Sequence, residues 1–139
     1  MITINMVRDS VMTTLKQHFP NLNVYGEEND QGLEEPYFYV KLLPVSQNQL
    51  LGQRYQRNHS FDIHYLAGSN EALHDMAEQL YDKLELISVD GSLVRGTGMR
   101  HEIVDGLLHW FVAYNFHVLR TVEPEPLMQS MKQEGYLRG

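Results

Sequence analysis

The chain has 139 residues, enough for one domain with a hydrophobic core of its own. Hydrophobic residues make up 42% of it and cysteine is absent, a composition typical of a globular protein that uses neither disulfides nor thiolate chemistry. Eleven Lys and Arg stand against eighteen Asp and Glu, giving a net charge of −7. Because an acidic chain gains little from phosphate contacts, nucleic acid is not expected to be a principal partner. No apolar run approaches the roughly 18 residues of a membrane span. The start MITINMVRDS lacks the order of a signal peptide, so we expect no membrane partner.

The N-terminal segment predicts an amphipathic helix that begins after Thr3 and ends before Pro20. Its apolar stripe is formed by Ile4, Val7, Val11, Leu15 and Phe19. A short strand around NLNVY follows. Residues 27–35 then hold acidic and no basic side chains, which favours a solvated loop. We take its carboxylates as candidate interface residues: Glu27, Glu28, Asp30, Glu34 and Glu35.

Two aromatic, β-branched runs, YFYVKLLPV and HSFDIHYLAG, predict strands of one hairpin from Tyr37 to Leu66. The segment between them is polar and Gln-rich, with Gly52 as the expected turning point. Its tip carries Arg54 and Arg57 and little apolar matter. A tip with nothing to bury in its own domain is expected to project toward a partner, so both arginines are candidate interface residues.

The segment SNEALHDMAEQLYDKLELI predicts a second helix, with Ser69 or Asn70 as the N-cap. Its apolar stripe is expected to extend from Leu73 to Ile87. The opposite side is acidic, which is typical of a solvated face, and consists of Glu71, Asp75, Glu78, Asp82 and Glu85.

The most informative local pattern is MRHEIVDGLLHWFVAYNFHV, in which Asp105-Gly106 predicts a two-residue hairpin turn with positive φ at both positions. That register places His101 opposite Trp110 and Glu102 opposite His109. One face of the ribbon is then apolar and faces the core: Met99, Ile103, Leu108, Trp110, Val112, Tyr114, Phe116 and Val118. Upstream, RGTGMR favours a turn or bulge that leads into this hairpin.

Residues 1–120 therefore predict a single α+β domain, a mainly antiparallel sheet with two helices on one face, in the order α-β-β-β-α-β-β. The partner of the first strand is left open. Residues 121–139 form a separate C-terminal tail or arm, because Pro124 and Pro126 each remove a backbone donor that a sheet requires. Its apolar side chains are candidate contacts with a neighbour: Leu127, Met128 and Met131.

The stretch NHSFDIHY holds two histidines and an aspartate, the residue types of a metal site. In a strand, however, His59 faces one side of the sheet whereas Asp62 and His64 face the other. The strand thus supplies two ligands, and an open zinc site needs three. His109 or His117 would have to complete it, and the spacing requires neither, so we predict no metal and no cofactor.

Motifs of enzymes are absent from the sequence, including G-x-S-x-G, the P-loop, G-x-G-x-x-G and HExxH. A metal-dependent nuclease would need carboxylates beside a lysine at a strand end, for which Asp62 with Lys41 is the single weak candidate. We therefore expect no catalytic residues. The alternative from a different class is a small metal-dependent hydrolase or nuclease that uses Asp62, His64 and a distant histidine.

Across residues 1 to about 120 the chain resembles the phage tail terminator, or tail completion, proteins of prophages from Gram-positive bacteria. The phrases that carry the resemblance run in order: NLNVYGEE, GLEEPYFYVKLLP, RYQRNHSFDIHY, MAEQLYDKLELI and RGTGMRHEIVDGLLHWFVAYNFHV. None is a chemical motif, and the resemblance implies no catalytic residue. It does not cover the C-terminal EPEPLMQSMKQEGYLRG.

The resemblance implies a structural protein of the virion tail, assembled in the cytoplasm of the bacterial host. Such proteins form a six-fold ring on the last ring of a tail tube, stop its growth and offer a surface to the neck and head. The partners implied are further copies of the chain, the tube protein and neck or head-completion proteins, with DNA passing through the ring. A different head–tail joining protein is the alternative within this class.

Overall fold

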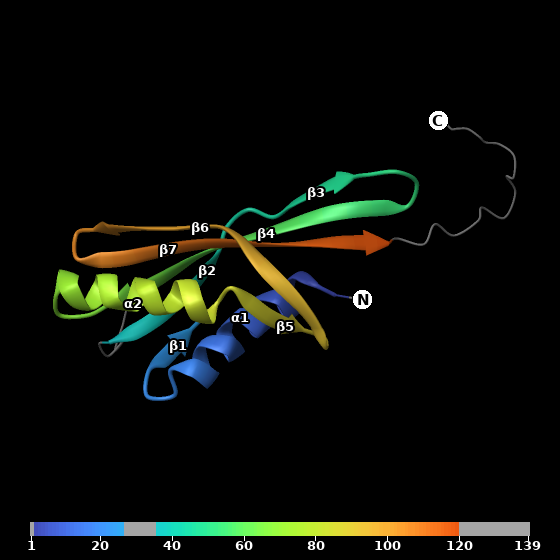
Figure 1. Ribbon diagram of the computed structural model, residues 1–139. Helices are drawn as coiled ribbons and strands as arrows, with labels where there is room; N and C mark the ends of the chain where they lie inside the picture. Colours follow the sequence, from blue (N-terminus) through green and yellow to red (C-terminus); the bar gives the residue numbers. More distant parts are fainter. Residues whose placement is uncertain (1, 27–35, 120–139) are drawn as a thin grey trace, which may run out of the picture.

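The computed structural model describes residues 2–26 and 36–119, which form two helices and a seven-stranded sheet (Figure 1). Both helices cover the same face of the sheet, as predicted. The elements are α1 (Ile4–His18), β1 (Asn23–Tyr25), β2 (Tyr37–Leu42), β3 (Ser46–Gln49), β4 (Arg54–Leu66), α2 (Asn70–Lys83), β5 (Leu86–Val89), β6 (Ser92–Val104) and β7 (Leu107–Leu119). Neither helix is long and apolar enough to cross a membrane.

The sheet has the strand order β1-β2-β4-β7-β6-β5, and β3 pairs with one end of β4. The pair β1–β2 is parallel, which answers the question left open for the first strand, and the other pairs are antiparallel. The α+β class is confirmed. Two strands, β3 and β5, are additional to the predicted order. β3 is a polar SQNQ segment whose four residues are all exposed, without the alternation that marks a strand.

The second addition corrects the predicted end of the second helix. α2 ends at Lys83, and Ile87 lies in β5, where it pairs with Val94 of β6. Glu85 likewise follows the helix and does not belong to its acidic face. The apolar residues of LELISV continue the helical stripe in sequence, so periodicity alone carried the helix too far. The β-branched pair Ile87 and Val89 is buried in the strand that follows.

Local signals at the ends of the elements act as predicted. The hydroxyl of Thr3 accepts from the N–H of Met6, and that of Ser69 accepts from the N–H of Ala72, both at 3.2 Å. Asp105 and Gly106 have φ values of 52° and 75°, which the type I′ turn between β6 and β7 requires. The RGTGMR segment forms the predicted bulge, a register shift between Thr97 and Arg100.

The core lies between the helices and the apolar face of β7, where Trp110 and Tyr114 are fully buried. The Tyr114 hydroxyl donates to the carbonyl of Leu84 at 2.6 Å, and burial raises the pKa of this phenol. The helix stripes pack against the same face through Val7, Val11, Leu15, Leu73, Met76, Ala77 and Leu80.

His59 is 1% exposed on the helix side of β4, with Nδ1 lying 3.2 Å from the carbonyl oxygen of Tyr114. Burial lowers the pKa of His59, opposed by the Tyr114 carbonyl and assisted by the charge of Arg57. Protonation of His59 is therefore less favourable in the folded protein than in the unfolded chain, where the pKa of a histidine is about 6.5. The contribution of neutral His59 to the unfolding free energy is expected to be complete above about pH 6.5. It should decrease as the pH falls from there toward the lower pKa of the folded state.

A His59→Phe variant keeps the ring and removes this titration, so its unfolding free energy should vary less between about pH 6.5 and 5. Urea unfolding at several pH values measures the slope, to which one such proton contributes at most about 1.4 kcal/mol per pH unit. His18→Phe serves as the control, because His18 is exposed. Equal slopes for the wild type and His59→Phe would show that the proton is not excluded at this site.

Beyond the helices, the sheet continues as a narrow three-stranded extension (Figure 1). It consists of β3, residues 54–58 of β4 and residues 115–119 of β7, and we call it the arm. The arm is held by the ladder from Ser46↔Asn58 to Gln49↔Tyr55 on one side and from Arg54↔Leu119 to Asn58↔Asn115 on the other. It is thus a defined part of the sheet that projects from the body of the domain.

Candidate assembly surfaces

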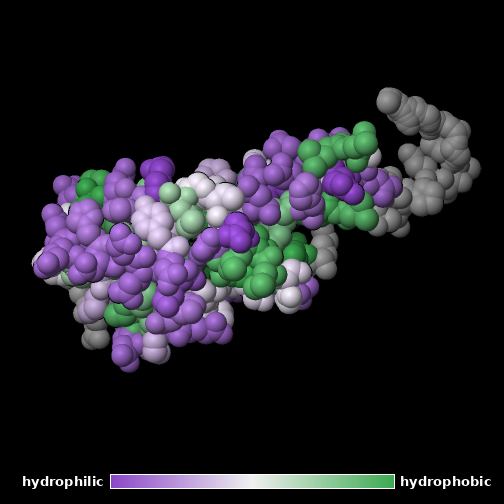
Figure 2. Space-filling view, viewed as in Figure 1, coloured by the Kyte–Doolittle hydropathy of each residue, from purple (hydrophilic) through white to green (hydrophobic). Residues whose placement is uncertain are grey.

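The tip of the arm exposes large apolar side chains. Leu51 is 92% exposed and Leu119 is 72% exposed, with Leu50 beside them at 39%. Figure 2 shows hydrophobic surface, in green, at the far end of the arm, interrupted by hydrophilic surface in purple. The turn is shaped by Gly52, which has a φ of 68° as expected of the turning residue. The tip thus groups exposed leucines that make little packing contact within the described part of the chain, which makes it a candidate contact surface.

The two predicted arginines do lie at this end of the arm, but they differ. Arg57 donates from Nε and Nη2 to Oε1 of Gln47 at 3.1 and 2.7 Å, which ties its guanidinium to β3. Arg54 is exposed and makes no ion pair within the part of the chain that the structure describes. The expectation of a basic tip with little apolar matter was incomplete, because Leu50 and Leu51 lie beside Arg54.

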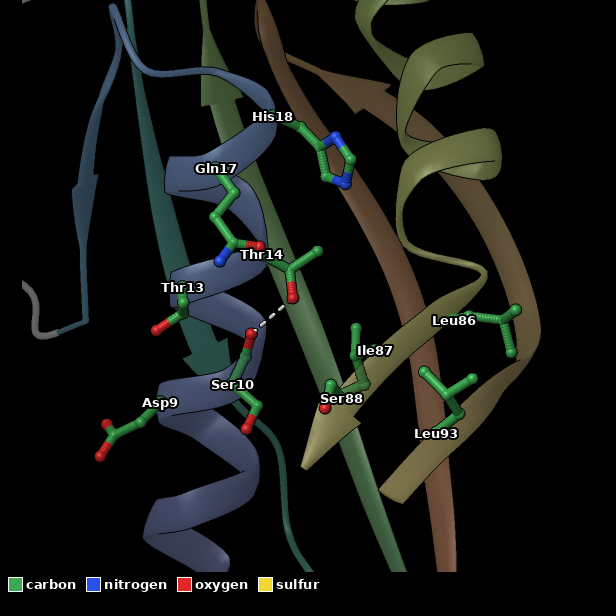
Figure 3. A pocket seen from close by; sticks show the side chains of 10 residues that line it. All are labelled: Asp9, Ser10, Thr13, Thr14, Gln17, His18, Leu86, Ile87, Ser88 and Leu93. Carbon is green, nitrogen blue, oxygen red and sulfur yellow. Dashed lines mark hydrogen bonds between the residues drawn. The ribbon is translucent and has the colours of Figure 1, made fainter. Parts of the chain in front are cut away.

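A second candidate surface is a cleft of about 460 Å³ between α1 and β5 (Figure 3), which has a polar wall on the α1 side and leucines on the strand side. Its mouth is formed by Leu93 and Leu86, which are 73% and 43% exposed. On the helix side, the hydroxyls of Ser10 and Thr14 donate to backbone carbonyls one turn earlier, at 2.8 and 2.7 Å. The polar side chains of Asp9, Thr13 and Gln17 also line the cleft, so it combines an apolar edge with a polar wall. β5 is also an outer strand of the sheet.

The remaining predicted interface residues have no described position. Glu27, Glu28, Asp30, Glu34 and Glu35, and the C-terminal Leu127, Met128 and Met131, lie outside the described residues. The acidic face of α2 is described and is exposed as predicted through Glu71, Asp75, Glu78 and Asp82.

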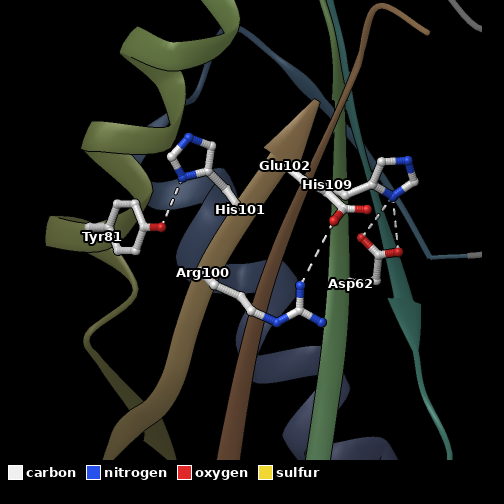
Figure 4. Close-up of polar contacts among 6 residues, drawn as sticks. All are labelled: Asp62, Tyr81, Arg100, His101, Glu102 and His109. Carbon is white, nitrogen blue, oxygen red and sulfur yellow. Dashed lines mark hydrogen bonds and ion pairs between the residues drawn. The ribbon is translucent and has the colours of Figure 1, made fainter. Parts of the chain in front are cut away.

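The sheet face that the helices leave open carries a polar cluster. Asp62 is 7% exposed there, and its Oδ2 lies 3.0 Å from Nε2 of His64 and 3.1 Å from Nδ1 of His109. Burial alone would raise the pKa of Asp62, but its contacts with the two imidazoles lower it. Figure 4 shows Asp62 and His109 turned toward each other across β4 and β7. His59 faces the opposite side, as predicted, and the distant histidine that joins is His109 and not His117.

A different histidine pair lies beside α2. Nδ1 of His74 is 3.3 Å from Nε2 of His101, whose Nδ1 lies 2.8 Å from the hydroxyl of Tyr81. Figure 4 shows the Tyr81–His101 contact on the helix side of β6. No carboxylate joins this pair within the described ranges, which distinguishes it from the cluster at Asp62.

The fold and these surfaces describe a small α+β domain with a projecting arm that carries exposed leucines at its tip. The family model described as "Phage tail terminator protein" matches residues 6–126, and the chain belongs to that family. It is accordingly a structural component of a bacteriophage tail that interacts with other virion proteins.

No curated protein matches the chain. Among the solved structures that match, one aligns with 15% identity and a TM-score of 0.49 over 87% of this chain and 98% of that chain.

Proposed function

We propose that the protein assembles as a ring on the end of a tail tube, stops tube polymerisation and presents the surface to which the neck or head attaches. The observation that carries this proposal is the match to the terminator family over residues 6–126. Capping requires a closed assembly on the tube end, and closure requires that each copy carry two different surfaces that fit one another.

The arm tip and the α1–β5 cleft are two such surfaces. The tip is convex and carries Leu51 and Leu119, whereas the cleft is concave and has Leu86 and Leu93 at its mouth. They belong to different elements, so one copy can offer its tip to one neighbour and its cleft to another. A head-to-tail contact of this kind closes into a ring when the rotation between copies allows. We therefore propose that the arm tip of each copy packs into the cleft of the next.

Charge supports the same docking. Arg54 and Arg57 accompany the apolar tip, and α2 presents an exposed acidic face formed by Glu71, Asp75, Glu78 and Asp82. We propose that the two arginines approach the acidic face of α2 or the acidic segment 27–35 of the neighbour. Opposite charges of this kind mainly set orientation and the rate of encounter.

Reversing both charges in Arg54→Glu/Arg57→Glu is expected to slow assembly at low salt by about tenfold or more without unfolding the monomer. The defect should shrink in high salt, where charges are screened. Light scattering during assembly measures the rate, and Lys41→Glu/Arg100→Glu is the control with the same change in charge. Assembly of the arm variant at the wild-type rate would contradict the electrostatic part of the proposal.

Polymerisation of purified tube protein tests the function itself. Adding the terminator to growing tubes is expected to stop their elongation. The amount of terminator required should be proportional to the number of tube ends. Tubes that continue to grow at an unchanged rate in the presence of saturating protein would refute capping.

A further inference from the structure

We propose that Asp62, His64 and His109 bind one divalent transition-metal cation of the Zn²⁺ class on the open face of the sheet. The proposal goes beyond tail capping, since neither the ring nor the arm contact calls for an ion. It rests on the geometry of three side chains from two neighbouring strands.

The strand register brings these residues together. Asp62 and His64 are two apart on β4 and so point to the same face. His64 lies directly opposite His109 in the β4–β7 ladder, and Asp62 lies opposite Phe111. Both strands are in the middle of the sheet, so the three positions are fixed by backbone hydrogen bonds on each side. His117 on the same strand faces Gln56, too far along the ladder to take part.

The distances fit a shared ion. Three ligands at bonds of about 2.0–2.1 Å in a tetrahedral arrangement are about 3.3 Å from one another. One nitrogen of each imidazole and one Asp62 oxygen all lie within 4.8 Å of one another. The two carboxylate–imidazole distances are already 3.0 and 3.1 Å. The remaining distance, between the two imidazole nitrogens, is at most 4.8 Å. A movement of less than about 1.5 Å by one imidazole would therefore bring all three ligand atoms to tetrahedral spacing.

The polar groups at the cluster also call for a cation. Asp62 is a carboxylate with 7% exposure, and the described residues give it no partner among Lys and Arg. Nε2 of His64 is buried, and its 3.0 Å contact with Oδ2 of Asp62 lowers the pKa of Asp62 but is poorly aligned as a hydrogen bond. A buried nitrogen that is close to an oxygen but not aligned with it is costly as a hydrogen-bonding group. A metal ion bound between the His64 nitrogen and the Asp62 oxygen would use both atoms as ligands and would not require this alignment.

The donor set selects the class of ion. Two imidazole nitrogens and one carboxylate oxygen suit Zn²⁺, Co²⁺ or Ni²⁺, whereas Mg²⁺ and Ca²⁺ prefer oxygen ligands alone. Three protein ligands would leave a fourth coordination position for a water molecule, as in open zinc sites. Aromatic rings contact both imidazoles. The rings of Tyr39 and His64 meet edge-on with centroids 5.3 Å apart, and the rings of Phe111 and His109 are stacked with centroids 6.3 Å apart.

The test is a titration of tag-free, chelator-treated protein with Co²⁺, followed by competition with Zn²⁺. Visible absorption of bound Co²⁺ is expected to saturate at one ion per chain, and Zn²⁺ should abolish it. His64→Ala/His109→Ala is expected to lose the saturable signal. The matched control His74→Ala/His101→Ala removes two histidines from the other pair and should keep it.

Absence of saturable binding to the wild-type protein would overturn the proposal, as would a signal that survives in the His64/His109 variant and disappears in the control. X-ray absorption of the wild-type protein with Zn²⁺ bound provides a second measurement that needs no variant. Two imidazoles in the first coordination shell are expected, and a shell of oxygen atoms alone would refute the site.

Discussion

A Leu51→Glu substitution is expected to leave the monomer folded and to abolish ring assembly. Leu51 is 92% exposed, so the monomer loses no packing when it is replaced. In the proposed contact, the same side chain is buried in the cleft of a neighbour, where a leucine contributes about 1.5–3 kcal/mol. A buried carboxylate adds a desolvation penalty. Together these reduce the association constant of each contact by at least about a hundredfold. Native mass spectrometry and sedimentation velocity measure the assembled fraction.

Two further variants make this test specific to the arm and the cleft. Val104→Glu places the same charge on an exposed residue at the β6–β7 turn, at the other end of the long strands, and should assemble normally. Leu93→Lys alters the cleft mouth, and combining it with Leu51→Glu sets opposite charges against each other. Assembly is expected to recover partly in the double variant. Normal assembly by Leu51→Glu, or equal loss in Val104→Glu, would refute the arm–cleft contact.

The largest stability effect is expected at Gly96, a buried glycine of β6. A Cβ there would lie 2.7 Å from Cγ2 of Val112, 3.2 Å from the carbonyl oxygen of Leu84 and 3.3 Å from Cε1 of Tyr114. The Gly96 N–H also donates to the carbonyl of Glu85 at 2.7 Å, so β6 cannot move away freely. Overpacking of this kind costs about 1–3 kcal/mol, and we expect Gly96→Ala to reach the upper part of that range.

Gly68→Ala is the matched control, because a Cβ at Gly68 meets nothing within 4 Å and its φ lies outside the left-handed region. Urea unfolding of the two variants should differ by about 2 kcal/mol or more in unfolding free energy. Equal stability of Gly96→Ala and the wild type would mean that β6 and β7 are not packed as closely against the end of α2 as described.

Local patterns predicted most of the fold. Asp105-Gly106 specified the last hairpin and its register, and the period of 3.6 residues located α1 and most of α2. Both signals arise within a few residues of chain. β3 was not predicted because it has no apolar face that would mark it in the sequence. It is held by backbone pairing with β4. β5 was absorbed into the second helix because Leu84 and Ile87 fit a helical stripe as well as a strand.

The candidate surfaces were harder to predict for the same reason. That Leu51 and Leu119 meet at one tip depends on the pairing of β4 with β7, strands separated by α2, β5 and β6. The same pairing brings His109 to Asp62, which the spacing within NHSFDIHY cannot reveal. Sequence placed Arg54 and Arg57 on the projecting hairpin, because the polar segment around Gly52 stands between two strand patterns. The resemblance to tail terminators came from the order of phrases along the chain, and the family match bears it out.

Electron microscopy of isolated headless tail tubes mixed with the labelled protein tests the central claim most directly. Label on one end of each tube, as a ring-shaped density, is the result expected of a terminator. The Leu51→Glu variant should leave that end bare. Label along the whole tube, or none on either end while the protein binds isolated portal or neck proteins, would contradict the capping role.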